Sequence, residues 1–215
     1  MIKLREAIEH TVLKPDTTIA HIEKVCKEAI QYHFAAVCIP PYFLSDAIDL
    51  LMETEIEVAT VVGFPFGYNS TIAKFEETEY ALLRGAHHID AVTNIAAIKN
   101  NDWETVEDEI ETLTKLVHTE NRVIKIIAET GLLNEIEIEL LCKIANDYKI
   151  DYMKTSTGVS KTGATVDVVK LLRKNLHPLI KIKASGGITS KEFALELIAA
   201  GADRLGTSSG VELVS

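Results

Sequence analysis

Tyr152-Met-Lys-Thr-Ser-Thr-Gly158 is a short β-type run that ends in a lysine, and Lys181-Ile-Lys-Ala-Ser-Gly-Gly187 repeats the arrangement one helical segment later. In each stretch, Lys154 or Lys183 is followed by small residues and a glycine. Two such runs separated by a helical segment are typical of a β-α-β unit with parallel strands. The two stretches therefore predict neighbouring strands that both end in a lysine.

The same alternation extends along the whole chain of 215 residues. Short β-type runs occur at Ile8–Leu13, Ala35–Ile39, Val58–Val62, Ile89–Thr93, Val123–Ala128, Tyr152–Thr155, Ile180–Ala184 and Arg204–Thr207. Between them lie segments with helical periodicity at Ile19–Tyr32, Phe43–Glu53, Ile72–Arg84, Trp103–His118, Ile136–Tyr148, Val166–Leu176 and Lys191–Ala199. Eight strands that alternate with helices predict an α/β fold, a (β/α)8 TIM barrel that forms a single domain over residues 1–215.

Local signals refine the predicted helices. The apolar residues of segment 72–84 predict one buried helix face, made of Phe75, Tyr80, Leu82 and Leu83. Thr189-Ser-Lys-Glu192 fits a capping box at a helix start. Gly85 and Gly201 follow their helices where a left-handed residue is expected.

Composition excludes several classes of protein. A net charge of −10 disfavours nucleic-acid binding, because no basic stripe is available to neutralise phosphates. No run approaches the ~20 apolar residues of a membrane span, and the charged amino terminus does not fit a signal peptide. Cys26, Cys38 and Cys142 are scattered, without metal-ligand spacing. We expect a soluble, cytoplasmic protein with reduced thiols and no metal.

The barrel prediction places catalytic residues at the carboxyl ends of the strands. Polar residues do occur within or just after the β-type runs: His10, Cys38, Asp90, Asn94, Lys125, Glu129, Lys154 and Lys183. Lys154 and Lys183 lie on the sixth and seventh predicted strands, so their amines can converge. A lysine attacks a carbonyl group only as the neutral amine, and a second cation nearby favours that form. The pair therefore predicts Schiff-base chemistry on one of the two lysines.

The loops after the last two strands predict a phosphate site. Ser185-Gly186-Gly187 ends the seventh strand, and Gly206-Thr-Ser-Ser-Gly210 ends the eighth. Glycines let the backbone approach an anion, and hydroxyl groups add hydrogen-bond donors. In barrels of this kind this pair of loops is a common phosphate site.

An ordered set of motifs links the chain to a known family. The motifs are Ile8-Glu-His-Thr-Val-Leu-Lys-Pro15, Ala36-Val-Cys-Ile-Pro40, Val62-Gly-Phe-Pro65, Leu83-Arg-Gly-Ala86 leading to Ile89-Asp90, Glu129-Thr-Gly-Leu-Leu133, Lys154-Thr-Ser-Thr-Gly158, Gly163-Ala-Thr165, Lys183-Ala-Ser-Gly-Gly187 and Gly206-Thr-Ser-Ser-Gly210. Over almost its entire length the chain resembles deoxyribose-phosphate aldolases.

The resemblance implies a class I aldolase that reversibly cleaves 2-deoxy-D-ribose 5-phosphate to D-glyceraldehyde 3-phosphate and acetaldehyde, without a cofactor or metal. It implies that Lys154 is the Schiff-base nucleophile, Lys183 the lysine that tunes it and Asp90 the partner in proton transfer. The expected partners are the phosphorylated sugar, its aldehydes and a second copy of the chain in a homodimer. The residues expected to bind substrate or phosphate are Gly186, Gly187, Gly206, Ser208, Ser209, Thr155 and Cys38.

Other polar residues receive simpler interpretations. Cys38 is expected to be a packed or substrate-contacting cysteine, because the chemistry needs no thiol. His87 and His88 are expected in a surface or loop role, since adjacent strand residues point to opposite faces. Lys125 is a rival second lysine, and we expect an interior ion pair between Lys125 and Glu129.

Departures from the family pattern leave alternatives open. Glu9 stands where the family commonly has aspartate, and the His87-His88 pair replaces a position that is usually acidic. The chain also lacks the tyrosine-bearing tail of some members, so enamine protonation is expected to depend on Lys183, Asp90 and water. The alternatives are a Schiff-base aldolase for another phosphorylated sugar or keto acid, and a silent barrel that binds a sugar phosphate.

Overall fold

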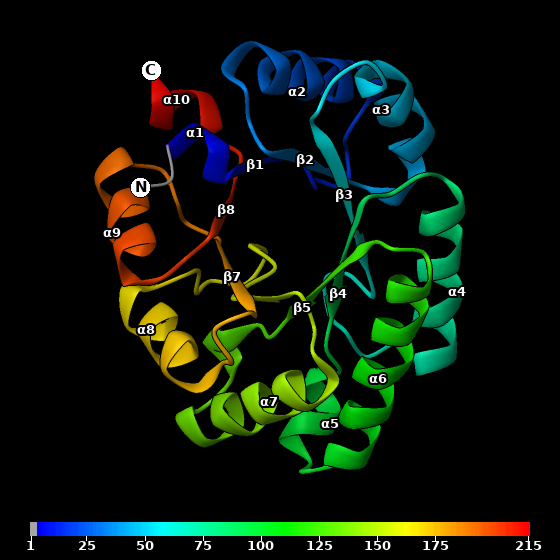
Figure 1. Ribbon diagram of the computed structural model, residues 1–215, viewed down its shortest axis with the longest axis vertical. Helices are drawn as coiled ribbons and strands as arrows, with labels where there is room; N and C mark the ends of the chain where they lie inside the picture. The colour runs from blue at the N-terminus through cyan, green and yellow to red at the C-terminus, as the bar shows by residue number, and fades with distance from the viewer. Residues whose placement is uncertain (1–3) are drawn as a thin grey trace.

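Parallel strands form one closed barrel in the computed structural model, which describes residues 4–215. Residues 1–3, which the predicted domain includes, lie outside the described residues. Each strand pairs with its neighbours in the sequence, and β1 closes the barrel against β8 (Figure 1). The strands are β1 (Ile8–Thr11), β2 (Ala36–Ile39), β3 (Glu57–Val62), β4 (His88–Val92), β5 (Val123–Ile127), β6 (Tyr152–Lys154), β7 (Lys181–Ser185) and β8 (Arg204–Thr207). The TIM-barrel prediction is confirmed.

The helices lie outside the ring of strands (Figure 1). The helices expected from the sequence are α2 (Ile19–Tyr32), α3 (Leu44–Leu51), α4 (Thr71–Leu83), α6 (Trp103–Thr119), α7 (Glu135–Tyr148), α8 (Val166–Asn175) and α9 (Lys191–Ala200). Short elements were not predicted: α1 (Leu4–Ala7), α5 (Ile95–Lys99), α10 (Gly210–Val214) and the 3₁₀ helices η1 (Pro41–Phe43) and η2 (Thr130–Leu132). Within residues 4–215, no helix combines the length and the apolar character needed to cross a membrane.

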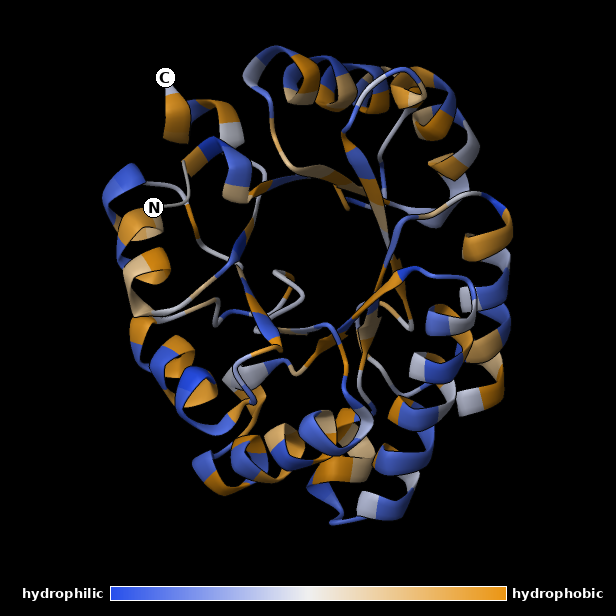
Figure 2. Cartoon of the chain, in the orientation of Figure 1, coloured by the Kyte–Doolittle hydropathy of each residue, from blue (hydrophilic) through white to orange (hydrophobic). Residues whose placement is uncertain are grey.

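The hydrophobic core lies between the strands and the surrounding helices. Bands of hydrophobic and hydrophilic residues alternate along the helices, whereas β3 and β5 are largely hydrophobic (Figure 2). Buried apolar residues from both layers, such as Ile89 on β4 and Ile110 on α6, belong to one continuous cluster. This core holds the strands in register, which fixes the positions of the side chains that project into the barrel.

One local prediction was wrong in part and another was wrong. On α4 the fully buried residues are Lys74, Thr78 and Ala81. Of the predicted face, Phe75 and Leu82 are partly buried against the core, while Tyr80 and Leu83 are exposed. The residues at positions 74, 78 and 81 face the barrel at helical spacing, so the apolar pattern misplaced the inner face. Helix α9 is capped by Ser190, whose hydroxyl oxygen accepts a hydrogen bond from the Phe193 amide at 3.2 Å, and not by a capping box at Thr189.

The glycine prediction is confirmed at both positions. Gly85 and Gly201 have φ angles of 91° and 116°, in the left-handed region that disfavours residues with a Cβ atom. Gly201 ends α9, and Gly85 ends the turn after α4. Both residues turn the chain back toward the next strand of the barrel.

Candidate active site

Lys154 and Lys183 converge on one carboxylate inside the barrel. The two lysines are direct partners in the pairing of β6 with β7. The Lys154 Nζ atom lies 2.8 Å from Asp90 Oδ2, and the Lys183 Nζ atom lies 2.7 Å from the same oxygen. Asp90 is on β4, so the closure of the barrel brings the three side chains together. The predicted convergence of the two amines is therefore present.

Glu9 and Lys125 complete this group. Lys125 Nζ lies 3.0 Å from Asp90 Oδ1 and 3.5 Å from Glu9 Oε2. Lys183 also donates a hydrogen bond to Glu9 Oε2. These five side chains, Glu9, Asp90, Lys125, Lys154 and Lys183, are at most 2% exposed. We call them the interior charge cluster.

Mutual stabilisation fixes the charge of most members. Burial would raise the pKa of Glu9, but Lys125 and Lys183 outweigh it and lower this pKa to about 2. Burial would likewise raise the pKa of Asp90, yet the neighbouring lysines hold it well below its ordinary range. Burial would lower the pKa of Lys183, but Asp90 and Glu9 raise it above its ordinary value. Lys183 and both carboxylates therefore stay charged near neutral pH.

The cluster holds one more cation than it holds anions when all of its members are ionised. An uncompensated charge in a buried site is unfavourable, so the loss of one ammonium proton would leave the cluster neutral. Lys154 makes a single ion pair there and shares its oxygen with Lys183, whereas Lys183 contacts two carboxylates. Lys154 therefore has fewer carboxylate contacts than either of the other two lysines.

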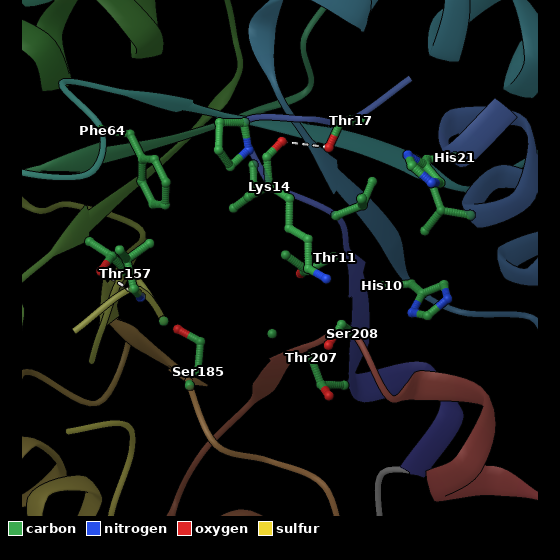
Figure 3. A pocket seen from close by; sticks show the side chains of 18 of the residues that line it. His10, Thr11, Lys14, Thr17, His21, Phe64, Thr157, Ser185, Thr207 and Ser208 are labelled. Carbon is green, nitrogen blue, oxygen red and sulfur yellow. Dashed lines mark hydrogen bonds between the residues drawn. The ribbon is translucent and has the colours of Figure 1, made fainter. Parts of the chain in front are cut away.

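A cavity of about 690 Å³ lies above Lys154. Lys154 lines it, whereas the other four members of the interior charge cluster do not. Ser185 is the last residue of β7, and Thr157 and Ser208 lie in the loops after β6 and β8. All three face the cavity at the carboxyl ends of the strands (Figure 3). A molecule in the cavity can therefore reach the Lys154 amine from solvent.

Some of the predicted substrate residues lie at this cavity and others do not. Gly186, Gly206 and Ser208 line it. Gly206 also makes room for the charge cluster, because a Cβ atom there would lie 3.0 Å from Lys183 Cε. The predicted residues that are not among the lining residues are Gly187, Ser209, Thr155 and Cys38.

Thr155, Ser209 and Cys38 have other contacts. The Thr155 hydroxyl group donates to the Ser185 carbonyl oxygen at 3.3 Å and accepts from its amide at 3.1 Å, which joins the ends of β6 and β7. The Ser209 amide donates to Thr207 Oγ1 at 2.9 Å. Burial raises the pKa of the Cys38 thiol, whose Sγ atom lies 4.0 Å from Asp90 Oδ2. This buried position agrees with a packed cysteine.

The expected ion pair between Lys125 and Glu129 is wrong. Glu129 instead accepts hydrogen bonds from the hydroxyl groups of Thr157 and Ser160, and the Ser160 bond measures 2.9 Å. Glu129 follows β5 and lies near the β6 loop, whereas Lys125 is in the middle of β5 and points at Asp90. The two side chains therefore lie at different levels of the barrel, Lys125 in its interior and Glu129 at the carboxyl ends of the strands.

The surface or loop role expected for His88 is also wrong. His88 is the first residue of β4, and its side chain is 3% exposed. Its Nδ1 atom lies 2.8 Å from Lys125 Nζ, and its Nε2 atom lies 3.1 Å from Glu57 Oε2. His87 faces the other way, is half-buried and accepts a hydrogen bond from the Val58 amide at 3.0 Å.

Lys14 is a cavity residue that the sequence analysis did not single out. It follows β1, and its side chain points into the cavity on the side of Thr11 and Ser208 (Figure 3). Lys14 forms no ion pair with any other described residue, so its charge is available to an anion in the cavity. Lys14 is part of the motif Ile8–Pro15, but the motif alone did not predict that its side chain points into a cavity.

Comparison with known proteins gives one consistent family. A model of the DeoC/LacD family of aldolases matches residues 5–212. The chain is 45% identical over 212 residues to deoxyribose-phosphate aldolase 1 of Bacillus licheniformis, which covers 99% of this chain and 95% of the relative. It is also 45% identical over 209 residues to deoxyribose-phosphate aldolase of Thermococcus kodakarensis, with 96% and 93% covered.

A solved structure shares the whole architecture. The tetrameric deoxyribose phosphate aldolase from Aeropyrum pernix superposes with a TM-score of 0.91 at 30% sequence identity. The match covers 98% of this chain and 89% of that chain. The similarity therefore includes the barrel and the loops that surround the cavity.

Proposed function

Because this chain belongs to the DeoC/LacD family of aldolases, as its motifs predicted, we propose that it reversibly cleaves 2-deoxy-D-ribose 5-phosphate to D-glyceraldehyde 3-phosphate and acetaldehyde. The observation that carries this proposal is the placement of Lys154. Its amine faces the cavity, while the other lysines of the interior charge cluster lie behind it with Asp90 between them. A nucleophile at the cavity and permanent charges behind it are what Schiff-base catalysis requires.

The reaction begins with a neutral Lys154 amine, which attacks the aldehyde carbon C1 of the open-chain sugar. Loss of water from the adduct gives an iminium ion that withdraws electrons from C2. The C3 hydroxyl group then loses its proton as the C2–C3 bond breaks, which releases C3 to C5 as glyceraldehyde 3-phosphate. The electron pair of that bond forms an enamine, which takes a proton at C2 before water hydrolyses the imine to acetaldehyde.

Asp90 and Lys183 are the groups placed to move these protons. Asp90 Oδ2 is 2.8 Å from the reacting nitrogen, and Lys183 is 2.7 Å from that oxygen. Asp90 is held as a carboxylate and Lys183 as an ammonium group, so one can accept a proton and the other can donate one, directly or through water. General acid–base catalysis of this kind contributes about 10²–10⁴ in rate.

The phosphate group of the substrate is proposed to bind between the loops after β7 and β8. Gly186, Gly206 and Ser208 line the cavity there, and Lys14 faces them with a charge that no described carboxylate neutralises. Backbone amides, a hydroxyl group and one ammonium group form a set that suits a small dianion.

Borohydride trapping tests the proposed reaction. The protein is incubated with acetaldehyde, reduced and mapped by peptide mass spectrometry. We expect an ethyl group on Lys154, together with turnover of 2-deoxyribose 5-phosphate. Labelling of Lys125 or Lys183 would overturn the assignment of the nucleophile, and the absence of any label would favour a silent barrel. Labelling without turnover of this sugar phosphate would favour an aldolase for another substrate.

The phosphate assignment is tested with Ser208→Asp. The added carboxylate opposes the substrate anion, so we expect KM for 2-deoxyribose 5-phosphate to rise by about tenfold or more, because like charges in contact cost several kcal/mol. Activity on unphosphorylated 2-deoxyribose should change far less. The matched control is Ser45→Asp, which adds the same charge on the exposed face of α3. Equal losses for the two sugars in Ser208→Asp would contradict the assignment.

We propose that the enzyme is a homodimer in the cytoplasm. Several large apolar side chains, including Tyr42, Phe66 and Tyr68, are exposed, and the Phe66 and Tyr68 rings stack at 5.4 Å. Light scattering of the purified protein should give twice the monomer mass, and fractionation of the source cells should recover the enzyme with the cytoplasmic fraction.

A further inference from the structure

The interior charge cluster does not end at Lys125. His88 Nδ1 lies 2.8 Å from Lys125 Nζ, and His88 Nε2 lies 3.1 Å from Glu57 Oε2. The Glu57 side chain is 43% exposed, whereas those of His88 and Lys125 are 3% and 0% exposed. A continuous series of hydrogen-bonding groups therefore leads from the buried lysines to solvent.

This series leaves the barrel at the end opposite the cavity. Glu57 and His88 are the first residues of β3 and β4, while Lys154 is the last residue of β6. Because all eight strands are parallel, their first residues lie at one end of the barrel and their last residues at the other. A substrate that fills the cavity above Lys154 does not cover Glu57.

The partners of His88 determine its tautomer. Lys125 is a donor, so Nδ1 of His88 accepts and the proton of the neutral ring lies on Nε2, where it is donated to Glu57. Burial and the nearby Lys125 ammonium both lower the pKa of His88, which agrees with a neutral ring. The other charged or titratable groups around His88 and Glu57 are Glu9 on β1, His87 directly before β4 and Arg204 on β8.

We propose that His88 and Glu57 form a proton path that connects the interior charge cluster to solvent at the amino ends of the strands and takes up the proton that Lys154 loses before it attacks a carbonyl group. The proposal rests on the Schiff-base function proposed above. Glu57 and His88 touch neither substrate nor Lys154, so they act through Lys125 and Asp90.

The proton balance closes without any other reactant. The Glu57 carboxylate takes the Nε2 proton of His88 while Nδ1 of His88 takes a proton from the Lys125 ammonium group. Lys125 is then protonated again by the proton that Lys154 passes through Asp90. One proton thus moves from Lys154 to Glu57 and then to water, and the His88 proton moves from Nε2 to Nδ1. The same series runs in reverse when the adduct loses its hydroxyl group as water, which returns the proton to the site and restores the starting tautomer of His88.

The decisive variant is His88→Gln. A glutamine amide can accept from Lys125 and donate to Glu57, but it cannot carry a proton through. Glu57→Gln breaks the outer end at a half-exposed position where folding is less at risk. His118→Gln is the matched control, because His118 Nε2 lies 3.0 Å from Asp151 Oδ2 in a similar pair that does not touch the lysines.

The experiment measures the rate of imine formation with 2-deoxyribose 5-phosphate by rapid quench with borohydride, in H₂O and D₂O and across pH, with circular dichroism as the folding control. Wild-type protein is measured first, since a wild type without imine or turnover would defeat the proposed function itself.

We expect His88→Gln to slow imine formation about tenfold, below the range of a direct acid or base because cavity water offers another route. Its solvent isotope effect should rise and KM should stay constant. Glu57→Gln should also slow imine formation and raise the solvent isotope effect, and His118→Gln should have the wild-type rate and isotope effect. A folded His88→Gln with the wild-type rate, pH profile and isotope effect would overturn the proposal. If His88→Gln does not fold, a folded Glu57→Gln variant with the wild-type rate, pH profile and isotope effect would overturn the proposal equally.

Discussion

Two regions of this barrel bury lysines beside carboxylates, and they differ in what surrounds the charges. Lys74 on α4 is 0% exposed, and its Nζ atom lies 2.6 Å from Glu109 Oε2 on α6 and 2.7 Å from the Val92 carbonyl oxygen. This pair lies between the helices and β4, with one cation and one anion. The interior charge cluster has three lysines and two carboxylates, and it reaches a cavity at Lys154.

Burial of a lysine is therefore no mark of catalysis. Burial lowers the pKa of Lys74 even though Glu109 opposes this shift, whereas the two carboxylates beside Lys183 raise its pKa. The pair of Lys74 and Glu109 carries no net charge, and Lys74 also donates to the Val92 carbonyl oxygen while Glu109 accepts from the Asn94 amide. The interior charge cluster differs from this pair in its excess of one cation and in the position of one lysine, Lys154, at a cavity.

The largest expected effect is at Lys154. Lys154→Met removes the nucleophile, so turnover should fall by at least about 10⁴, as for the loss of other covalent nucleophiles. Borohydride should trap no ethyl group anywhere in the variant. Lys170→Met, an exposed lysine on α8, should keep the wild-type rate. An adduct that forms in Lys154→Met would show that burial, and not position at the cavity, selects the reactive lysine.

At Lys74 the expected loss is of stability. Lys74→Met leaves Glu109 buried without its partner, which should lower the free energy of unfolding by about 3–5 kcal/mol. The double variant Lys74→Met/Glu109→Leu removes both charges and should recover most of that loss. Urea unfolding measures the stability, and trapping on the folded protein should still label Lys154. A double variant as unstable as the single one would contradict the view of a replaceable ion pair.

The sequence revealed the two regions unequally. Lys154 and Lys183 could be predicted to meet, because they end adjacent strands of the predicted barrel, whereas the place of Asp90 beside them came from the family resemblance. Lys74 gave no such signal. Its partner Glu109 is 35 positions further along the chain, and the apolar residues around Lys74 suggested a different inner face.

Side-chain partners inside the barrel were also beyond the sequence. Glu129 is four positions after Lys125, which suggested an ion pair, but the strand ends between them and the two side chains occupy different levels of the barrel. His87 and His88 were both expected in a surface or loop role because adjacent strand residues point to opposite faces, and that rule did not show that His88 is the one that points inward. Such pairings depend on the stagger of neighbouring strands, which the order of the strands does not specify.

At Lys183 the expected effect is smaller than at Lys154 and concerns charge. Lys183→Leu removes a permanent cation from Asp90 Oδ2, so that oxygen is left to the Lys154 ammonium alone. Turnover should fall about 10²-fold, as for the loss of a general acid. The rise of imine formation with pH should also move to higher pH. A folded variant with the wild-type pH profile would show that desolvation of Lys154, and not charge in the cluster, favours its neutral form.

The smallest expected effect is the response of stability to acid, which differs in sign between the two regions. Glu9 has a folded pKa of about 2, below its ordinary value of 4.5, so its ionised form favours the folded state. This contribution is present above pH 4.5 and is lost as the pH falls toward 2, a total of about 3 kcal/mol. Burial raises the pKa of Glu109 despite Lys74, so protonation of Glu109 favours the folded state. Acid should therefore destabilise the protein through the interior cluster and not through Lys74 and Glu109.

Urea unfolding from pH 6 to pH 3 separates the two contributions. Glu9→Gln should flatten the acid limb of the wild-type curve by up to about 1.4 kcal/mol per pH unit, because one proton no longer binds on unfolding. Glu109→Gln removes a group that binds its proton more tightly in the folded state, so its acid limb should be at least as steep as that of the wild type. If Glu109→Gln flattened the acid limb and Glu9→Gln did not, the carboxylate with the lowered pKa would be Glu109 and not Glu9. The interior charge cluster would then lack the ionised Glu9 that is argued to hold Lys183 as a cation. The charge imbalance would then no longer support the proposal that Lys154 is the nucleophile.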